Sequence, residues 1–204
     1  MKEAQHFSTK LAPVALALLL PLSCSETRGT SGTEEPAVRW LAPAEVGPHG
    51  EAPGAKLRLV SSQADGAKSF VLILSKGDEV MTALADFARD QKVVNAHFVG
   101  IGGVRDPEVA WFDLTRKEFK AMSLAEQMEV LTMSGDIALA ESGQPIVHTH
   151  LALGRSNGTA WGGHLLHAVT SPTLELYVTT FPQPLYKRAD PDTGILFIDP
   201  SVVR

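Results

Sequence analysis

Three histidines in the second half of the chain have the residue type and the spacing of a metal site. His148 and His150 lie two residues apart in Pro145-Ile-Val-His-Thr-His150, and His164 follows in Gly162-Gly-His164. On a β-strand, side chains two residues apart point to the same face of the sheet. Neutral imidazole binds zinc well, and three histidine ligands leave the fourth position on the metal open. The pattern therefore indicates a site for zinc or another divalent metal.

The pairing of the strands decides whether His164 can join the other two histidines. Asn157-Gly158 favours a two-residue hairpin turn. That register would place His150 opposite Leu165, and it would turn His164 to the other face. A bulge at Gly162-Gly163 would reverse the face of His164, and the conflict would also disappear if the two strands are not paired neighbours. If neither holds, the His-x-His pair is an ordinary polar feature of a half-exposed strand.

Two further residues are candidates for the outer shell of the metal site, where a side chain hydrogen-bonds a ligand histidine. They are Glu129 and His97. A zinc-dependent hydrolase or lyase would need a carboxylate in reach of water at the open position, and Glu129 is the candidate for that role. His97 lies in an apolar segment, where a histidine satisfied within the core is the simpler interpretation. We therefore name no catalytic residue and expect a binding module, with enzymatic activity left open.

A mostly antiparallel β-sheet with a helix packed on it is expected to position these residues. Gly77-Asp78-Glu79 opens a helix whose apolar side chains from Val80 to Ala88 share one face. Short, turn-like links join the predicted strands, which favours antiparallel pairing and the α+β fold class. They are Arg105-Asp106-Pro107, Glu141-Ser142-Gly143, Ser156-Asn157-Gly158 and Ser171-Pro172. Alternating or apolar runs predict strands at residues 56–60, 69–74, 94–104, 108–114, 118–122, 128–140, 146–153, 159–170 and 174–181.

Composition narrows the class of protein further. The 204 residues are 44% hydrophobic and 20% charged, with a net charge of −5, which fits one domain with or without a tail. The chain has no apolar run of the roughly 18 residues that span a bilayer. A single cysteine excludes an intramolecular disulfide framework. The acidic balance gives no support to a general affinity for nucleic acid or anionic lipid.

The single cysteine, Cys24, ends a segment that resembles a bacterial lipoprotein signal peptide. Lys2 and Lys10 precede an apolar run over residues 11–22, and Ser23 stands directly before the cysteine. The resemblance implies removal of residues 1–23 and acylation of Cys24, which anchors the protein to a membrane without a spanning helix.

The residue after the cysteine and the composition beyond it complete this expectation. Ser25 lacks the negative charge that retains a lipoprotein at the inner membrane, so by analogy we expect an exported protein of the cell envelope, at the outer membrane. Residues 24–55 are rich in Pro and Gly and are expected to form a flexible tether after the lipidated cysteine. Residues 56–204 are then the globular domain.

Several short segments occur in a recognisable order: Asn95-Ala-His-Phe-Val-Gly-Ile-Gly-Gly-Val104, Met128-Glu-Val-Leu-Thr-Met-Ser-Gly135, Pro145-Ile-Val-His-Thr-His150, Gly162-Gly-His-Leu165, Pro184-Leu-Tyr-Lys-Arg188 and Asp192-Thr-Gly-Ile-Leu196. Together they resemble the plants-and-prokaryotes-conserved (PPC) domain over residues 56–200. The resemblance implies an antiparallel sheet flanked by helices, assembled as a homotrimer. It also implies that His148, His150 and His164 hold a metal, usually zinc, and it favours the reversed face of His164 over the simple hairpin register. A site shared between two subunits of such a trimer would also remove the register conflict.

The same family suggests a rival function as a DNA-binding regulator. In plant members the DNA contact belongs largely to a separate basic AT-hook with an Arg-Gly-Arg core, which this sequence lacks. Its densest basic pairs are Arg116-Lys117 and Lys187-Arg188, too few for a strong phosphate contact. We therefore do not expect a nucleic acid partner. The expectation is an envelope-anchored, trimeric, metal-binding PPC module, whose small-molecule ligand the sequence does not identify.

Overall fold

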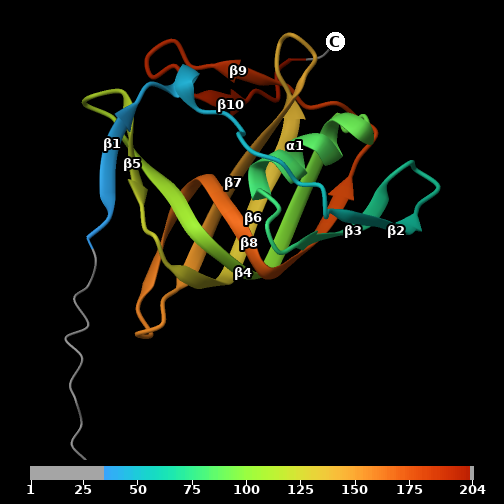
Figure 1. Ribbon diagram of the computed structural model, residues 1–204. Helices are drawn as coiled ribbons and strands as arrows, with labels where there is room; N and C mark the ends of the chain where they lie inside the picture. Colours follow the sequence, from blue (N-terminus) through green and yellow to red (C-terminus); the bar gives the residue numbers. More distant parts are fainter. Residues whose placement is uncertain (1–34, 203–204) are drawn as a thin grey trace, which may run out of the picture. The chain divides into compact units, whose positions relative to one another are not determined.

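The computed structural model describes residues 35–202, which form an eight-stranded antiparallel sheet and one α-helix (Figure 1). The strand order is β1-β5-β4-β6-β7-β8-β3-β2, and β4 also pairs with β8, so that β4, β6, β7 and β8 make a closed circuit of pairings. The predicted α+β class is confirmed, with a single α-helix among the described residues. The strands are β1 (Ala37–Leu41), β2 (Lys56–Ser62), β3 (Lys68–Ser75), β4 (Asn95–Asp113), β5 (Glu118–Ser123), β6 (Gln127–Leu139), β7 (Pro145–Gly154) and β8 (Ala160–Thr180).

The helix α1 (Val80–Asp90) covers one face of this sheet and forms the main core with it. Glu79 caps its first turn, since its carboxylate accepts hydrogen bonds from the backbone N–H groups of Met81 and Thr82. Leu84 is fully buried on the inner side of the helix. Truncation of such a side chain to alanine costs about 2–5 kcal/mol, because it leaves a cavity in a close-packed interior. The helix therefore covers one face of the sheet and packs with it in the main core.

Two strands are longer than the sequence predicts. Residues 94–104 and 108–114 belong to one strand, β4, and residues 159–170 and 174–181 belong to one strand, β8. The predicted turn at Arg105-Asp106-Pro107 is a break in register between β4 and β8, and Ser171-Pro172 is a cis peptide inside β8. Both breaks bend a strand without reversing it, because its neighbours continue to pair on either side. The bends let β4 and β8 pair along two separate stretches.

The ends of the described chain pack against the sheet. Residues 37–41, which lie in the predicted tether, form β1 and pair with β5 at the edge of the sheet. Among the described residues, the sheet therefore begins before the predicted domain boundary at residue 56. The turn η1 (Pro43–Glu45) follows β1, and a small second sheet joins β9 (Lys187–Ala189) to β10 (Leu196–Ile198). Residues 1–34, which include the predicted signal peptide and Cys24, lie outside the described residues. Across residues 35–202, no helix has the length and the apolar character needed to cross a membrane.

Candidate metal centre

The three predicted histidines converge on one face of the sheet within a single chain. His148 and His150 lie on β7, and His164 lies on β8 directly opposite His150. Their ring centroids are 5.0 to 5.3 Å apart, and one nitrogen of each ring lies within 4.8 Å of the others. In a tetrahedral zinc site the ligand nitrogens are about 3.3 Å apart. Small side-chain movements, without any change of register, would therefore bring all three imidazoles onto one ion.

The loop between β7 and β8 explains why His164 lies on the correct face. The predicted two-residue turn at Asn157-Gly158 is wrong: β7 and β8 pair from Gly154 and Ala160 outward, with residues 155–159 as the loop. Inside the loop, Arg155 N–H donates to the Thr159 carbonyl at 2.9 Å. The longer loop shifts the register by one residue, and such a shift moves a side chain to the opposite face. The reversed face of His164 thus comes from the loop, because β7 and β8 pair without a bulge.

Gly162 and Gly163 serve a different purpose from the predicted bulge. A Cβ atom on Gly162 would lie 2.2 Å from the Leu151 carbonyl oxygen, and one on Gly163 would lie 2.7 Å from the Ala110 carbonyl oxygen. Side chains at these positions would push β8 away from β7 on one side and from β4 on the other. The two glycines therefore allow the close strand contacts that hold His164 beside His150.

The surroundings of the cluster keep two of its imidazoles neutral. Burial, together with the nearby His148 and His150, lowers the pKa of His164 to about 3. Partial burial and the neighbouring His148 also lower the pKa of His150. A neutral imidazole has a free nitrogen lone pair, which is the form that binds a metal. The donor set of three imidazoles therefore fits zinc or a similar divalent ion.

A carboxylate and a buried lysine support the cluster behind His148. Asp136 lies on β6 opposite His148, and its Oδ2 is 3.1 Å from His148 Nδ1. Its other oxygen is 2.6 Å from the Nζ of Lys187, a side chain with 2% exposure. Burial alone would raise the pKa of Asp136, but the contacts with His148 and Lys187 outweigh it and lower the pKa. Asp136 is therefore an ionised acceptor behind His148, the arrangement that orients histidines in known metal sites.

The outer-shell residues named from the sequence lie elsewhere. Glu129 is exposed and pairs with Gly154 at the far end of β7. His97 is also exposed, although we expected it in the core; it lies on β4 opposite Asp136, with its ring 5.7 Å from that of Phe181. The residue that contacts a ligand histidine is Asp136, which the sequence reasoning did not single out. A hairpin centred on the predicted turn Glu141-Ser142-Gly143 would have placed it opposite His148.

An aromatic side chain supports the cluster from the side of His164. Phe119 on β5 stacks against the His164 ring, with centroids 5.1 Å apart. It belongs to a second hydrophobic cluster with Ala110, Ala121 and Leu166, against which Leu41 of β1 also packs. Strand β1 thus packs, through Leu41, against the cluster that contains Phe119, and Phe119 in turn contacts the predicted ligand His164.

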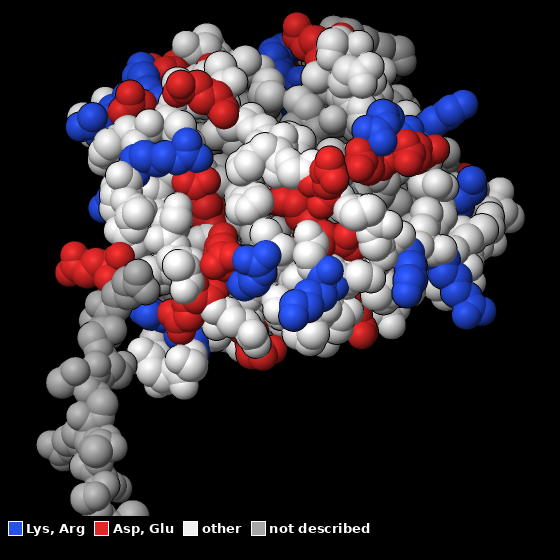
Figure 2. All heavy atoms as spheres, in the orientation of Figure 1, with Lys and Arg blue, Asp and Glu red and all other residues white. Residues whose placement is uncertain are grey.

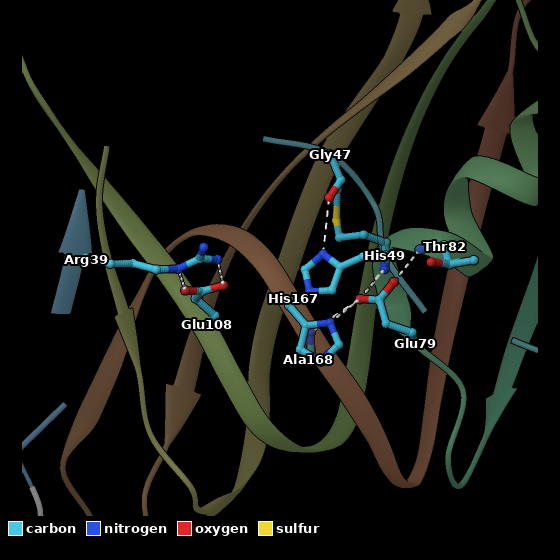
Figure 3. Close-up of polar contacts among 9 residues, drawn as sticks. Arg39, Gly47, His49, Glu79, Thr82, Glu108, His167 and Ala168 are labelled. Carbon is cyan, nitrogen blue, oxygen red and sulfur yellow. Dashed lines mark hydrogen bonds and ion pairs between the residues drawn. The ribbon is translucent and has the colours of Figure 1, made fainter. Parts of the chain in front are cut away.

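A separate histidine, His167, lies three residues beyond His164 and makes an ion pair (Figure 3). Its Nδ1 is 3.3 Å from Glu79 Oε1, and Glu79 is 2% exposed. The ring of His49 stacks on the ring of His167, with the two centroids 4.6 Å apart. The contact with Glu79 raises the pKa of His167. Nearby, Arg39 donates two hydrogen bonds of 2.8 Å to Glu108. His167 is therefore no fourth member of the cluster, because residues three apart on a strand point to opposite faces of the sheet.

Solved structures share this fold. A candidate DNA-binding protein from Ralstonia eutropha JMP134 is 30% identical, with a TM-score of 0.61 over 68% of this chain and 94% of that one. A protein described as metal-containing, from Archaeoglobus fulgidus, is 29% identical, with a TM-score of 0.59 over 64% and 92%. A PPC protein from Pyrococcus horikoshii, 22% identical, has a TM-score of 0.61 over 72% and 97% and shows the fold alone.

Two sequence comparisons also match this chain. The chain is 31% identical over 133 residues to a bifunctional GlmU protein of Synechococcus. The matched region covers 63% of this chain and only a fifth of that relative's length. The model of the Plants and Prokaryotes Conserved domain, abbreviated PCC or PPC, matches residues 61–182, and all three histidines of the cluster fall within this range. This chain therefore belongs to the Plants and Prokaryotes Conserved domain family.

Proposed function

We propose that this protein is a PPC-domain metal-binding module whose ion is held by His148, His150 and His164. The observation that carries the proposal is the convergence of three imidazole nitrogens within 4.8 Å on adjacent strands of one chain. A relative of known structure that is described as metal-containing adds support. Zinc is an ion that suits a set of three imidazole ligands.

The residues around the site favour binding over catalysis. A bound divalent ion supplies a Lewis acid with a coordination position open to a ligand. The three histidines hold the ion, and Asp136 orients His148. Across residues 35–202 the cluster of ligand atoms contains histidines alone. Hydrolysis would also need a general base in reach of the substrate, and the predicted candidate, Glu129, lies at the other end of β7.

Metal analysis of the purified full chain tests the site. We expect His150→Ala to lose nearly all bound zinc, because two imidazoles hold an ion far more weakly than three. His97→Ala is the matched control, since it removes an exposed histidine that lies outside the cluster. Equal and near-zero metal in the wild type and in His150→Ala would refute the metal site.

We propose a homotrimer as the assembled form, as the family resemblance implies. The support is an apolar patch on the face that carries His150. Val99, Ile101, Leu131 and Tyr177 are each between 52% and 62% exposed, and Val99 and Tyr177 pair on adjacent strands. A patch of large exposed apolar side chains is typical of an interaction site. Light scattering of the purified chain should give three times the monomer mass, and Ile101→Asp should reduce it; a monomeric wild type would contradict the trimer.

The proposed location, in the cell envelope through acyl chains on Cys24, rests on the sequence. Labelling with palmitate should mark the wild type and fail to mark Cys24→Ala. Equal labelling of both, or of neither, would refute the anchor.

DNA binding is the second candidate function, because a 30% identical relative of the same fold is a candidate DNA-binding protein. On the face that Figure 2 shows, the Lys and Arg side chains of the described residues are interspersed with Asp and Glu and form no continuous basic patch. Because phosphate contacts dominate DNA affinity, we expect weak binding that is lost at physiological salt. A gel-shift assay that shows salt-resistant binding would favour this second function.

A further inference from the structure

We infer that Lys187, acting through Asp136, is a positioning residue for the metal ligand His148. The inference rests on the proposed metal site, and it assigns a role to the segment that follows the matched family domain. Lys187 lies five residues beyond residue 182, where the family match ends. The argument depends on the contacts among Lys187, Asp136 and His148.

The three side chains form a chain of contacts that begins in the interior. Lys187 Nζ is 2.6 Å from Asp136 Oδ1, and Asp136 Oδ2 is 3.1 Å from His148 Nδ1. Lys187 is 2% exposed, and its buried ammonium group is costly unless it is paired. The pairing also fixes the carboxylate, because one oxygen is held by the lysine and the other is left for the histidine. Asp136 is therefore held in the orientation that His148 requires.

The backbone brings Lys187 to this position. Leu139, at the end of β6, donates its N–H to the Leu185 carbonyl at 2.8 Å and makes a parallel bridge with Tyr186. Leu185 N–H in turn donates to the Val94 carbonyl at 3.2 Å. These contacts hold residues 185–187 beside the end of β6. Their contact point, Leu139, is three residues from Asp136 along the strand. The lysine is thus delivered by a docked segment and not by a free tail.

The contact decides which nitrogen of His148 is available to a metal. A carboxylate accepts a hydrogen bond, so Nδ1 of His148 carries the proton that it donates to Asp136. Nε2 is then the unprotonated nitrogen and the ligand atom. Without Asp136 in place, the imidazole can exchange between its tautomers and rotate. Loss of such an outer-shell partner typically lowers metal affinity about 10- to 100-fold.

A double-mutant cycle on the full chain tests this role. We expect Asp136→Asn to lower zinc affinity about 10-fold or more, and Lys187→Met to lower it by a similar factor. If the lysine acts only through the carboxylate, the double variant should match Asp136→Asn alone. Lys117→Met is the control, because it removes an equal charge from an exposed pair with Asp192. The double variant also guards against misfolding, since it leaves neither charge buried alone.

The tautomer of His148 in the metal-free chain gives a readout that a purely structural role would not change. Nitrogen NMR of the imidazole should show the Nδ1–H form in the wild type and in Lys117→Met, and a mixture in Lys187→Met. An affinity within twofold of wild type for folded Lys187→Met, or additive losses in the cycle, would overturn the inference. If the wild type binds no zinc, the proposed function fails. The role of Lys187 in positioning a metal ligand then fails with it, whichever tautomer of His148 is observed.

Discussion

His164 and His167 lie three residues apart on β8, and their surroundings give them opposite chemistry. His164 faces two imidazoles and the ring of Phe119, and burial lowers its pKa to about 3. His167 faces the buried carboxylate of Glu79, whose contact raises its pKa (Figure 3). The first is held neutral and can bind a metal. The second binds its proton more strongly and fastens the strand to the start of α1.

The comparison shows that the position of the nearest carboxylate decides whether a histidine forms an ion pair or keeps a nitrogen free for a metal. Glu79 contacts His167 directly, and the N–H groups of Met81 and Thr82 stabilise its charge at the start of α1. In the metal cluster the carboxylate, Asp136, lies behind His148 and its charge is neutralised by Lys187. The ligand nitrogens therefore gather without a competing anion among them.

The pH dependence of stability should separate the two regions most strongly. The pKa of His164 is about 3 in the folded chain and about 6.5 in the unfolded chain. Between these values the unfolded chain binds more protons, so the free energy of unfolding of metal-free protein should fall as pH falls from 6.5, by about 4 kcal/mol at pH 3. Urea unfolding at a series of pH values measures this loss. We expect His164→Ala to show a much shallower loss, and an unchanged slope would contradict the assignment.

His167 should show the opposite sign. Its folded pKa is raised, so its stabilising contribution is fully present below the unfolded pKa of about 6.5 and is lost as pH rises through the folded pKa. Glu79 has a lowered pKa, so its contribution is lost only as pH falls through that lowered value. Removal of the pair by Glu79→Gln should lower the free energy of unfolding by about 3 kcal/mol at pH 6, because the helix cap and the ion pair are both weakened.

Zinc affinity distinguishes this loss from damage to the metal site. Glu79→Gln should leave zinc affinity within about threefold of wild type in protein that remains folded, measured by competition with a chelator. A loss as large as that of His150→Ala would show that the two regions are one site.

A change at Phe119 should have the smallest effect and should reach the metal. Phe119→Leu keeps the side chain apolar and removes the stack on His164. We expect a cost in unfolding free energy of about 1 kcal/mol and a loss of a few-fold in zinc affinity, because the ring of His164 is less well oriented. Leu41→Ala, which thins the same hydrophobic cluster without contact to the histidine ring, is the comparison. If it lowers zinc affinity as much as Phe119→Leu, the stack has no special role.

Much of the fold could be predicted from the sequence, because alternation and apolar runs mark each strand and the face of α1. The length of β4 and β8 could not, because Asp106-Pro107 and Ser171-Pro172 look locally like turns while their neighbours continue the pairing. The three histidines that lie together in the cluster could be named from type and spacing. Their register could not, since it depends on a five-residue loop over residues 155–159, where Asn157-Gly158 suggests a loop of two residues.

The supporting residues were harder to find for a physical reason. Asp136 contacts His148 through cross-strand register, and Lys187 arrives through tertiary docking of a distant segment. Neither the Asp136–His148 contact nor the Lys187–Asp136 contact is marked by a short, regular spacing of residues in the sequence. The first could be derived from a hairpin centred on Ser142, whereas the second requires the folded chain.

The most direct test of the central claim is the zinc content of the full chain in two variants of neighbouring histidines on β8. We predict one zinc per chain in the wild type and in His167→Ala, and close to none in His164→Ala. Equal zinc content in the two variants would contradict the account, because it would show that the surroundings of these histidines do not divide metal binding from ion pairing.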